Sequence, residues 1–227
     1  MRRNSSIFAL AATSALLVSG IVQAGPIVYT VNSADPGQAE ADFLSTLAPG
    51  YLTEDFERES GFVAGDQAHS FDTAVGEFKQ LEAGSGGLCG AACGDGLKIL
   101  DADTSPFAGR FNTSPAPGSQ WLDSFDSKKV EFIPLPGANA IGFYITDPND
   151  AGGRYSFQLA SGETVELVSD IFGASLGNGK LFYLTFVSDV DITGLTILAN
   201  NSNDGYGIDD VTVGRVPEPG TLALLGL

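Results

Sequence analysis

Two acidic segments, one near each end of the chain, hold the residues whose types and spacing could support chemistry. They cover residues 53–57 and residues 204–213. Clustered carboxylates, together with backbone carbonyls, can supply the roughly six to eight oxygen ligands that Ca²⁺ takes. Without a cation, several carboxylates at one sheet edge would repel one another. The alternative is that these acids are solvated strand-edge residues, which also discourage edge-to-edge aggregation.

The same segments resemble the terminal strands of jelly-roll carbohydrate-binding modules. In those modules a Phe-Glu pair near the first strand lies beside an Ile-Asp-Asp-Val stretch in the last strand, and the acids bind a structural Ca²⁺. The matching residues are Phe56 and Glu57, and Ile208, Asp209 and Asp210. The resemblance covers these two segments only. It implies calcium as a structural cofactor held by Glu57, Asp209 and Asp210.

A third acidic stretch, residues 146–153, has the spacing of half a calcium loop but lacks the distal glutamate of an EF-hand. Its proline and its paired glycines favour an ordinary hairpin turn instead. Residues 201–205 are likewise typical of a turn.

Catalysis has little support in the sequence. His69 is the only histidine, and no Gly-x-Ser-x-Gly motif accompanies it. A glycosidase needs two carboxylates on opposite sides of the scissile bond, and no pair among the 28 acids stands out. The glycine-rich residues 84–90 lack the Lys-Ser/Thr ending of a phosphate-binding loop. We therefore expect a protein that is not an enzyme, with a secreted hydrolase as the least favoured reading.

Two aromatic residues could contact a sugar. Trp121 follows a loop rich in proline and glycine, residues 112–118, and Tyr206 lies in a turn. Sugar-binding sandwiches stack pyranose rings on exposed aromatic rings, so extracellular polysaccharide is the expected ligand. The alternative for a lone tryptophan in a sandwich is a place in the core.

The elements that must position these residues follow from the periodicity of the chain. Asp35 followed by Pro36 is typical of a helix N-cap and first position. Apolar residues then recur at helical spacing as far as Gly50, which predicts one helix over 36–48. Expected strands cover 27–31, 52–57, 77–81, 97–100, 129–133, 140–146, 155–159, 164–168, 181–187, 194–198 and 207–213. Surface loops are expected at 58–74, 84–95 and 101–120.

Many short strands that do not alternate with helices predict an all-β fold, a jelly-roll-type β-sandwich with one short N-terminal helix. Residues 25–215 suffice for one such domain. The formal net charge of −17 excludes nucleic acid as a partner, because a polyanion would be repelled.

The N-terminal residues predict export. Arg2 and Arg3 precede an apolar run over 7–18 that is too short for a bilayer span. Residues 22–24 match a cleavage site, so residues 1–24 are expected to be a signal peptide. Its removal would take away two positive charges and no acid, which leaves a net charge of −19.

The oxidising compartment makes a disulfide between Cys89 and Cys93 the expected pairing. A metal site is the alternative. Two thiolates without a nearby histidine fall short of the four ligands that it needs.

Residues 216–227 resemble the start of a PEP-CTERM sorting signal, with the motif Pro217-Glu218-Pro219 and an apolar continuation. Only seven residues follow Gly220, fewer than the roughly 20 of a bilayer span, and the basic tail of the family is missing. The resemblance implies processing by exosortase after passage through the secretion machinery. It implies the cell surface or extracellular matrix of a Gram-negative bacterium, with membrane contact only through this segment.

The similarity to PEP-CTERM proteins of unknown activity covers most of residues 36–227. It names a domain and not a function. The sequence therefore predicts an exported, non-catalytic protein that binds polysaccharide, or else a structural or adhesion protein of the matrix without specific sugar recognition.

Overall fold

The fold is described from a computed structural model, over residues 28–85, 95–115, 117–148, 155–159, 164–165, 176–199 and 203–217. The elements in chain order are β1 Val28–Asn32, α1 Pro36–Thr46, β2 Leu52–Glu54, the 3-10 helix η1 Arg58–Ser60, β3 Gln67–Ala68, β4 Ser70–Thr73, β5 Gly76–Glu82, β6 Leu97–Asp101, β7 Gln120–Asp123, β8 Lys129–Pro134, β9 Ala140–Thr146, β10 Tyr155–Leu159, β11 Thr164–Val165, β12 Leu181–Val187, β13 Leu195–Ala199 and β14 Gly207–Gly214.

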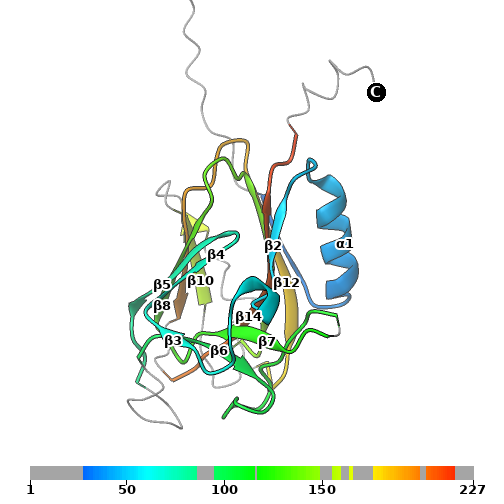
Figure 1. The fold of residues 1–227 in the computed structure, drawn as a ribbon. Helices are drawn as coiled ribbons and strands as arrows, with labels where there is room; N and C mark the ends of the chain where they lie inside the picture. The colour runs from blue at the N-terminus through cyan, green and yellow to red at the C-terminus, as the bar shows by residue number, and fades with distance from the viewer. Residues whose placement is uncertain are drawn as a thin grey trace, which may run out of the picture.

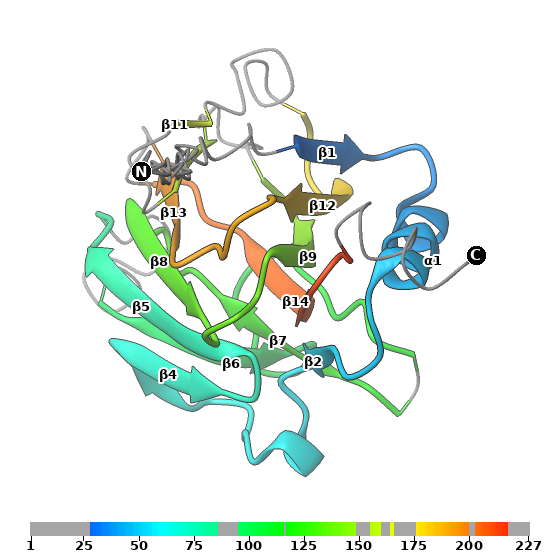
Figure 2. The ribbon, with the colours of Figure 1, turned by 90° about the horizontal axis from the view of Figure 1, so that it is seen from above.

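The strands form two antiparallel sheets that pack face to face (Figures 1 and 2). The first sheet has the order β1-β12-β9-β14-β7-β6-β3, and β2 pairs with β14 beside this path. The second sheet has the order β11-β10-β13-β8-β5-β4. The predicted all-β, jelly-roll-type sandwich with one short N-terminal helix is confirmed.

Aromatic and branched side chains from both sheets form the core. Phe143 and Phe186 of the first sheet stack with their ring centroids 6.1 Å apart. Phe78 and Phe132 of the second sheet stack with their centroids 4.4 Å apart. Each of these rings is nearly or fully buried. Burial of this apolar surface is the main source of stability in such a fold.

The helix α1 covers the outer face of the first sheet over β9 and β12 (Figure 2). Asp35 caps it by accepting a hydrogen bond from the Gln38 amide at 3.0 Å, as its sequence predicts. Phe43 packs on Tyr183 with the ring centroids 6.1 Å apart. Gly142 permits this close approach, because a Cβ atom there would lie 2.5 Å from the Phe43 ring.

The prediction of loops at 58–74 and 101–120 is wrong in part. The first segment contains η1, β3 and β4, and the second ends at the first residue of β7. These elements have four residues or fewer, and such short strands form by pairing with a neighbour rather than from a local pattern. Within the described ranges, no helix has the length and apolar character needed to cross a bilayer.

Several predictions fall outside the described residues. These are the signal peptide over 1–24, the pair Cys89 and Cys93, and residues Glu218 and Pro219 of the sorting motif. Pro217 is described and is half-buried at the end of the domain.

Candidate functional site

The two acidic segments lie side by side, as the sequence resemblance implied. β2 pairs antiparallel with β14, and Val211 lies opposite Glu54. The hydroxyls of Thr53 and Thr212 are hydrogen-bonded across the pair at 2.7 Å. A register shift in β14 between Asp209 and Thr212 disrupts the regular alternation there, as a β-bulge does.

Glu57 follows β2 in the chain. It holds one end of the segment over residues 112–120, here called the clamped loop. Its Oε1 atom accepts hydrogen bonds from the backbone amides of Ser119 and Gln120, the second at 2.7 Å. The Gln120 side chain donates in return to the Phe56 carbonyl at 2.7 Å. Glu57 is nearly buried. Its carboxyl serves as an acceptor for backbone N–H groups.

Asp209 and Asp210 hold the other end of the clamped loop. Asp209 Oδ2 accepts hydrogen bonds from the Thr113 amide at 2.6 Å and from the Thr113 hydroxyl at 3.0 Å. Asp210 Oδ1 accepts from the Ser114 hydroxyl at 2.6 Å. The acids that were expected to hold a cation thus fix both ends of one loop to the paired strands β2 and β14.

These acids lack positively charged partners. In the described part of the chain, no ion pair joins Asp55, Glu57, Asp209 or Asp210 to a lysine, arginine or histidine. Burial raises the pKa of Asp209 well above its usual value, and the charge of Asp210 adds to this. Burial also raises the pKa of Asp210, and the charges of Asp55 and Glu57 raise it further. Hydrogen bonds from the clamped loop oppose both shifts.

The carboxyl oxygens are of the hard type that suits calcium, and in this structure donors of the clamped loop occupy several of them. Across the described ranges, no three acid, histidine or cysteine side chains converge as metal ligands. Oxygen atoms of Glu57, Asp209 and Asp210 accept hydrogen bonds from the clamped loop instead. A cation could bind there only by taking the place of some of these donors.

Glu54 has a structural role that the sequence did not reveal. It is 1% exposed, and its carboxyl accepts hydrogen bonds from the Phe56 amide at 2.9 Å and the Ala74 amide at 3.0 Å. Phe56 has a φ of 56°, in the left-handed region that branched and bulky residues seldom adopt. Glu54 therefore stabilises the tight turn that directs Glu57 towards the clamped loop.

The expectation that Trp121 and Tyr206 are exposed sugar platforms is wrong. Trp121 is 1% exposed and Tyr206 is 0% exposed. The Trp121 ring lies on the outer face of the first sheet with Leu100 and Phe125, and its Nε1 donates to Asp123 Oδ2 at 3.2 Å. Phe107 packs against this cluster, so the tryptophan is buried, as the alternative interpretation held.

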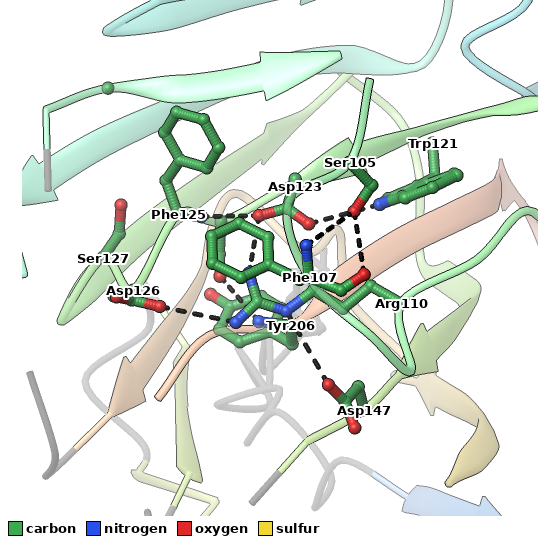
Figure 3. A network of polar contacts seen from close by, with 12 residues as sticks. Ser105, Phe107, Arg110, Trp121, Asp123, Phe125, Asp126, Ser127, Asp147 and Tyr206 are labelled. Atoms are coloured by element: carbon green, nitrogen blue, oxygen red, sulfur yellow. Dashed lines mark hydrogen bonds and ion pairs between the residues drawn. The ribbon is translucent and has the colours of Figure 1, made fainter. Parts of the chain in front are cut away.

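Trp121 and Tyr206 border a buried network around Arg110, which sequence reasoning missed (Figure 3). The Arg110 guanidinium lies 2.8 Å from Asp123, 3.4 Å from Asp126 and 3.9 Å from Asp147. It also lies 3.9 Å from the centroid of the Phe107 ring, a cation–π contact. All four charged residues are less than 9% exposed.

Asp147 belongs to the stretch over residues 146–153, whose spacing matches half of a calcium loop. In the structure it contacts the Arg110 guanidinium and a backbone amide. Its Oδ1 accepts from the Gly179 amide at 2.7 Å, and its other oxygen faces Arg110. The composition offered a signal for this ion pair, because the chain has only 11 basic residues against 28 acids. An arginine in an apolar context, next to Phe111, is then a candidate for a buried ion pair.

His69 contacts Gln80 and Asp95. Its Nδ1 lies 3.1 Å from Gln80 Oε1 and its Nε2 lies 3.3 Å from Asp95. In the described structure no serine is among its hydrogen-bond partners, and its side chain is 68% exposed.

Comparison with known proteins gives a distant structural likeness. No protein-family model matches the chain, and no curated protein matches it. Among solved structures, the K2 cleaved adhesin domain of Lys-gingipain is similar, with a TM-score of 0.41 and 13% sequence identity. That match covers 73% of this chain and 100% of the adhesin domain.

Proposed function

We propose that the protein is an exported, non-catalytic module of the cell surface or extracellular matrix, with a structural or adhesive role. The observation that carries this proposal is that the candidate acids form hydrogen bonds and ion pairs within the protein. Glu57, Asp209 and Asp210 hold the clamped loop, and Asp123 pairs with the buried Arg110. Carboxylates committed to loop anchoring suit a rigid scaffold better than a hydrolytic centre, whose acid and base must face the substrate.

The destination rests on the sequence. The signal-peptide pattern over 1–24 and the Pro217-Glu218-Pro219 motif support export and sorting by exosortase. We test this by fractionating cells of the source bacterium with an antibody to the domain. Cell-surface or matrix protein with an N-terminus at Gly25 supports the proposal, and cytoplasmic protein that retains residues 1–24 contradicts it.

Polysaccharide binding is a second candidate, and one observation favours it. Phe111 is 38% exposed and directly precedes the clamped loop, which carries Asn112. An exposed aromatic ring is a suitable stacking contact for a sugar ring. We therefore propose Phe111, rather than Trp121 or Tyr206, as the aromatic contact if the module binds a glycan.

The test is retention of the mature chain on a panel of bacterial and plant polysaccharides, in calcium and in chelator. Retention lost in Phe111→Ala, and kept in the matched variant Val63→Ala at an exposed apolar site elsewhere, supports glycan binding. Absence of retention leaves the structural or adhesive role. Release of soluble sugars by the wild type, abolished by changing one acid, would instead show a hydrolase.

Calcium binding is a separate part of the proposal. We propose that a Ca²⁺ would bind at Glu57, Asp209 and Asp210 in exchange for hydrogen bonds from the clamped loop. The absence of positively charged partners for these acids in the described structure supports the idea. The present arrangement, in which loop donors occupy the carboxyl oxygens, opposes it.

A further inference from the structure

An apolar cavity of about 280 Å³ lies where β14 ends. It is lined by residues 48–52 after α1, by residues 135–138 between β8 and β9, and by residues 213–215; we call it the exit pocket. Three of its large side chains are open to solvent, Tyr51 at 40%, Leu52 at 44% and Leu135 at 38%. Together these side chains offer an apolar surface that a short apolar segment could cover.

The described part of the chain ends beside this pocket. The Ala48 amide donates to the Arg215 carbonyl at 2.7 Å. Val216 is fixed by Asn139, whose side chain accepts from its amide at 2.8 Å and donates to its carbonyl at 3.2 Å. The chain beyond Pro217 therefore starts from a fixed point beside the pocket.

The residues that follow have the composition that would fill an apolar pocket. Leu222, Leu224, Leu225 and Leu227 lie in a run without charges. Between Pro217 and this run stands Pro219-Gly220, a dipeptide that favours a chain reversal. The five residue steps from Pro217 to Leu222 can span up to about 17 Å, which is enough to turn back to the pocket.

Charge does not oppose such a contact. Arg215 is the only charged residue of the pocket lining, and its guanidinium is held by Asp191 at 2.9 Å and by the Gly137 carbonyl. A segment tethered this closely also has an effective concentration in the millimolar range, which a free partner would have to exceed.

We propose that residues 221–227 of the same chain occupy the exit pocket, with leucine side chains packed against Tyr51, Leu52 and Leu135. The domain then shields its own apolar segment from water. This inference does not depend on the proposed sorting role, because it concerns the chain in solution. A second copy of the chain, or a lipid surface, would be the competing occupant.

Photo-cross-linking in the full chain from Gly25 identifies the occupant. A benzophenone amino acid replaces Tyr51, and Val63, which is 50% exposed and outside the pocket, is replaced in the control. We expect a cross-link from position 51 to the peptide containing residues 221–227 at the mass of a monomer, and none from position 63. A cross-link at the mass of a dimer, a lipid adduct with added vesicles, or no product at position 51 would overturn the proposal.

A double-mutant cycle gives an independent measure in the same full chain. Leu135→Asp and Leu225→Asp should each lower the Tm by about 2–4 °C, and the double variant should fall no further than either one. Leu81→Asp, at a leucine 42% exposed on β5, should add fully to Leu225→Asp. Full additivity of the pocket pair would overturn the contact, since residues that do not touch contribute independently.

Discussion

Asp209 binds Thr113 through two hydrogen bonds to one oxygen, from the amide at 2.6 Å and from the hydroxyl at 3.0 Å. The two residues are 96 positions apart in the chain. Glu57 makes the equivalent contact at the other end of the same loop. The acidic terminal strands thus act as an anchor for the clamped loop, a role that a list of carboxylates would not suggest.

Removing the Asp209 carboxyl should destabilise the fold. In Asp209→Ala the half-buried Thr113 amide loses its acceptor, which should cost up to the roughly 1–3 kcal/mol of an unsatisfied buried donor. Denaturant unfolding measures the loss. Asp72→Ala, at an exposed position on β4, should change the free energy of unfolding by less than about 0.5 kcal/mol. Equal effects of the two variants would show that the contact with Thr113 does not matter.

Arg110→Met should be among the most damaging single changes. It leaves Asp123, Asp126 and Asp147 facing one another without the guanidinium that they share. Breaking a buried pair by removing one partner costs about 3–5 kcal/mol. Arg215→Met removes an ion pair whose side chains are about half exposed, and it should cost about 0–1 kcal/mol. Similar unfolding midpoints for the two variants would contradict a buried network.

The pH dependence of stability should reveal Glu54. Burial raises its pKa above 4.5, although hydrogen bonds from the Ala74 and Phe56 amides oppose the shift. The folded protein therefore keeps the proton more tightly than the unfolded chain does. The resulting stability is fully present below about pH 4.5 and is lost as the pH rises through the pKa of the folded state.

Glu54→Gln should flatten this part of the pH profile, because the amide stays neutral throughout. The measurement is the unfolding midpoint of wild type and variant from pH 4 upwards. The control is Glu59→Gln, at an exposed residue of η1. A difference between wild type and Glu54→Gln that does not change with pH would rule out a raised pKa.

Calcium should raise the Tm if it binds at the proposed acids, because a ligand of the folded state stabilises it by mass action. Asp210→Asn should abolish the rise, and Asp72→Asn should leave it intact. A Tm that is the same in calcium and in chelator would exclude the ion. The hydrogen bonds to the clamped loop would then be the whole role of these carboxyls.

Trp121→Phe should lower stability without altering any glycan retention. The change deletes the hydrogen bond from Nε1 to Asp123 and leaves that carboxyl less satisfied, at a cost of about 1–3 kcal/mol. Both unfolding and retention should be measured at a temperature where the variant is folded. Selective loss of retention would restore the tryptophan as a binding residue.

The sequence by itself determined the class of fold and the helix. Asp35 and Pro36 define the start of α1 because capping and a fixed φ are local properties. Alternating apolar residues defined most of the longer strands, since a half-buried strand repeats every two residues. The resemblance to jelly-roll modules also predicted correctly that residues 53–57 lie beside residues 204–213.

Only the tertiary structure decided what the candidate residues do. Trp121 is buried because it packs with Leu100, Phe125 and Phe107, and the periodicity of its strand does not predict those partners. Arg110 finds its carboxylates on β7, 13 positions away, and after β9, and no local pattern indicates these pairings. β3 and β4 are too short to carry a pattern of their own. Local sequence specifies dihedral preferences and the face of a strand, whereas the partner of a long-range contact depends on how the layers pack.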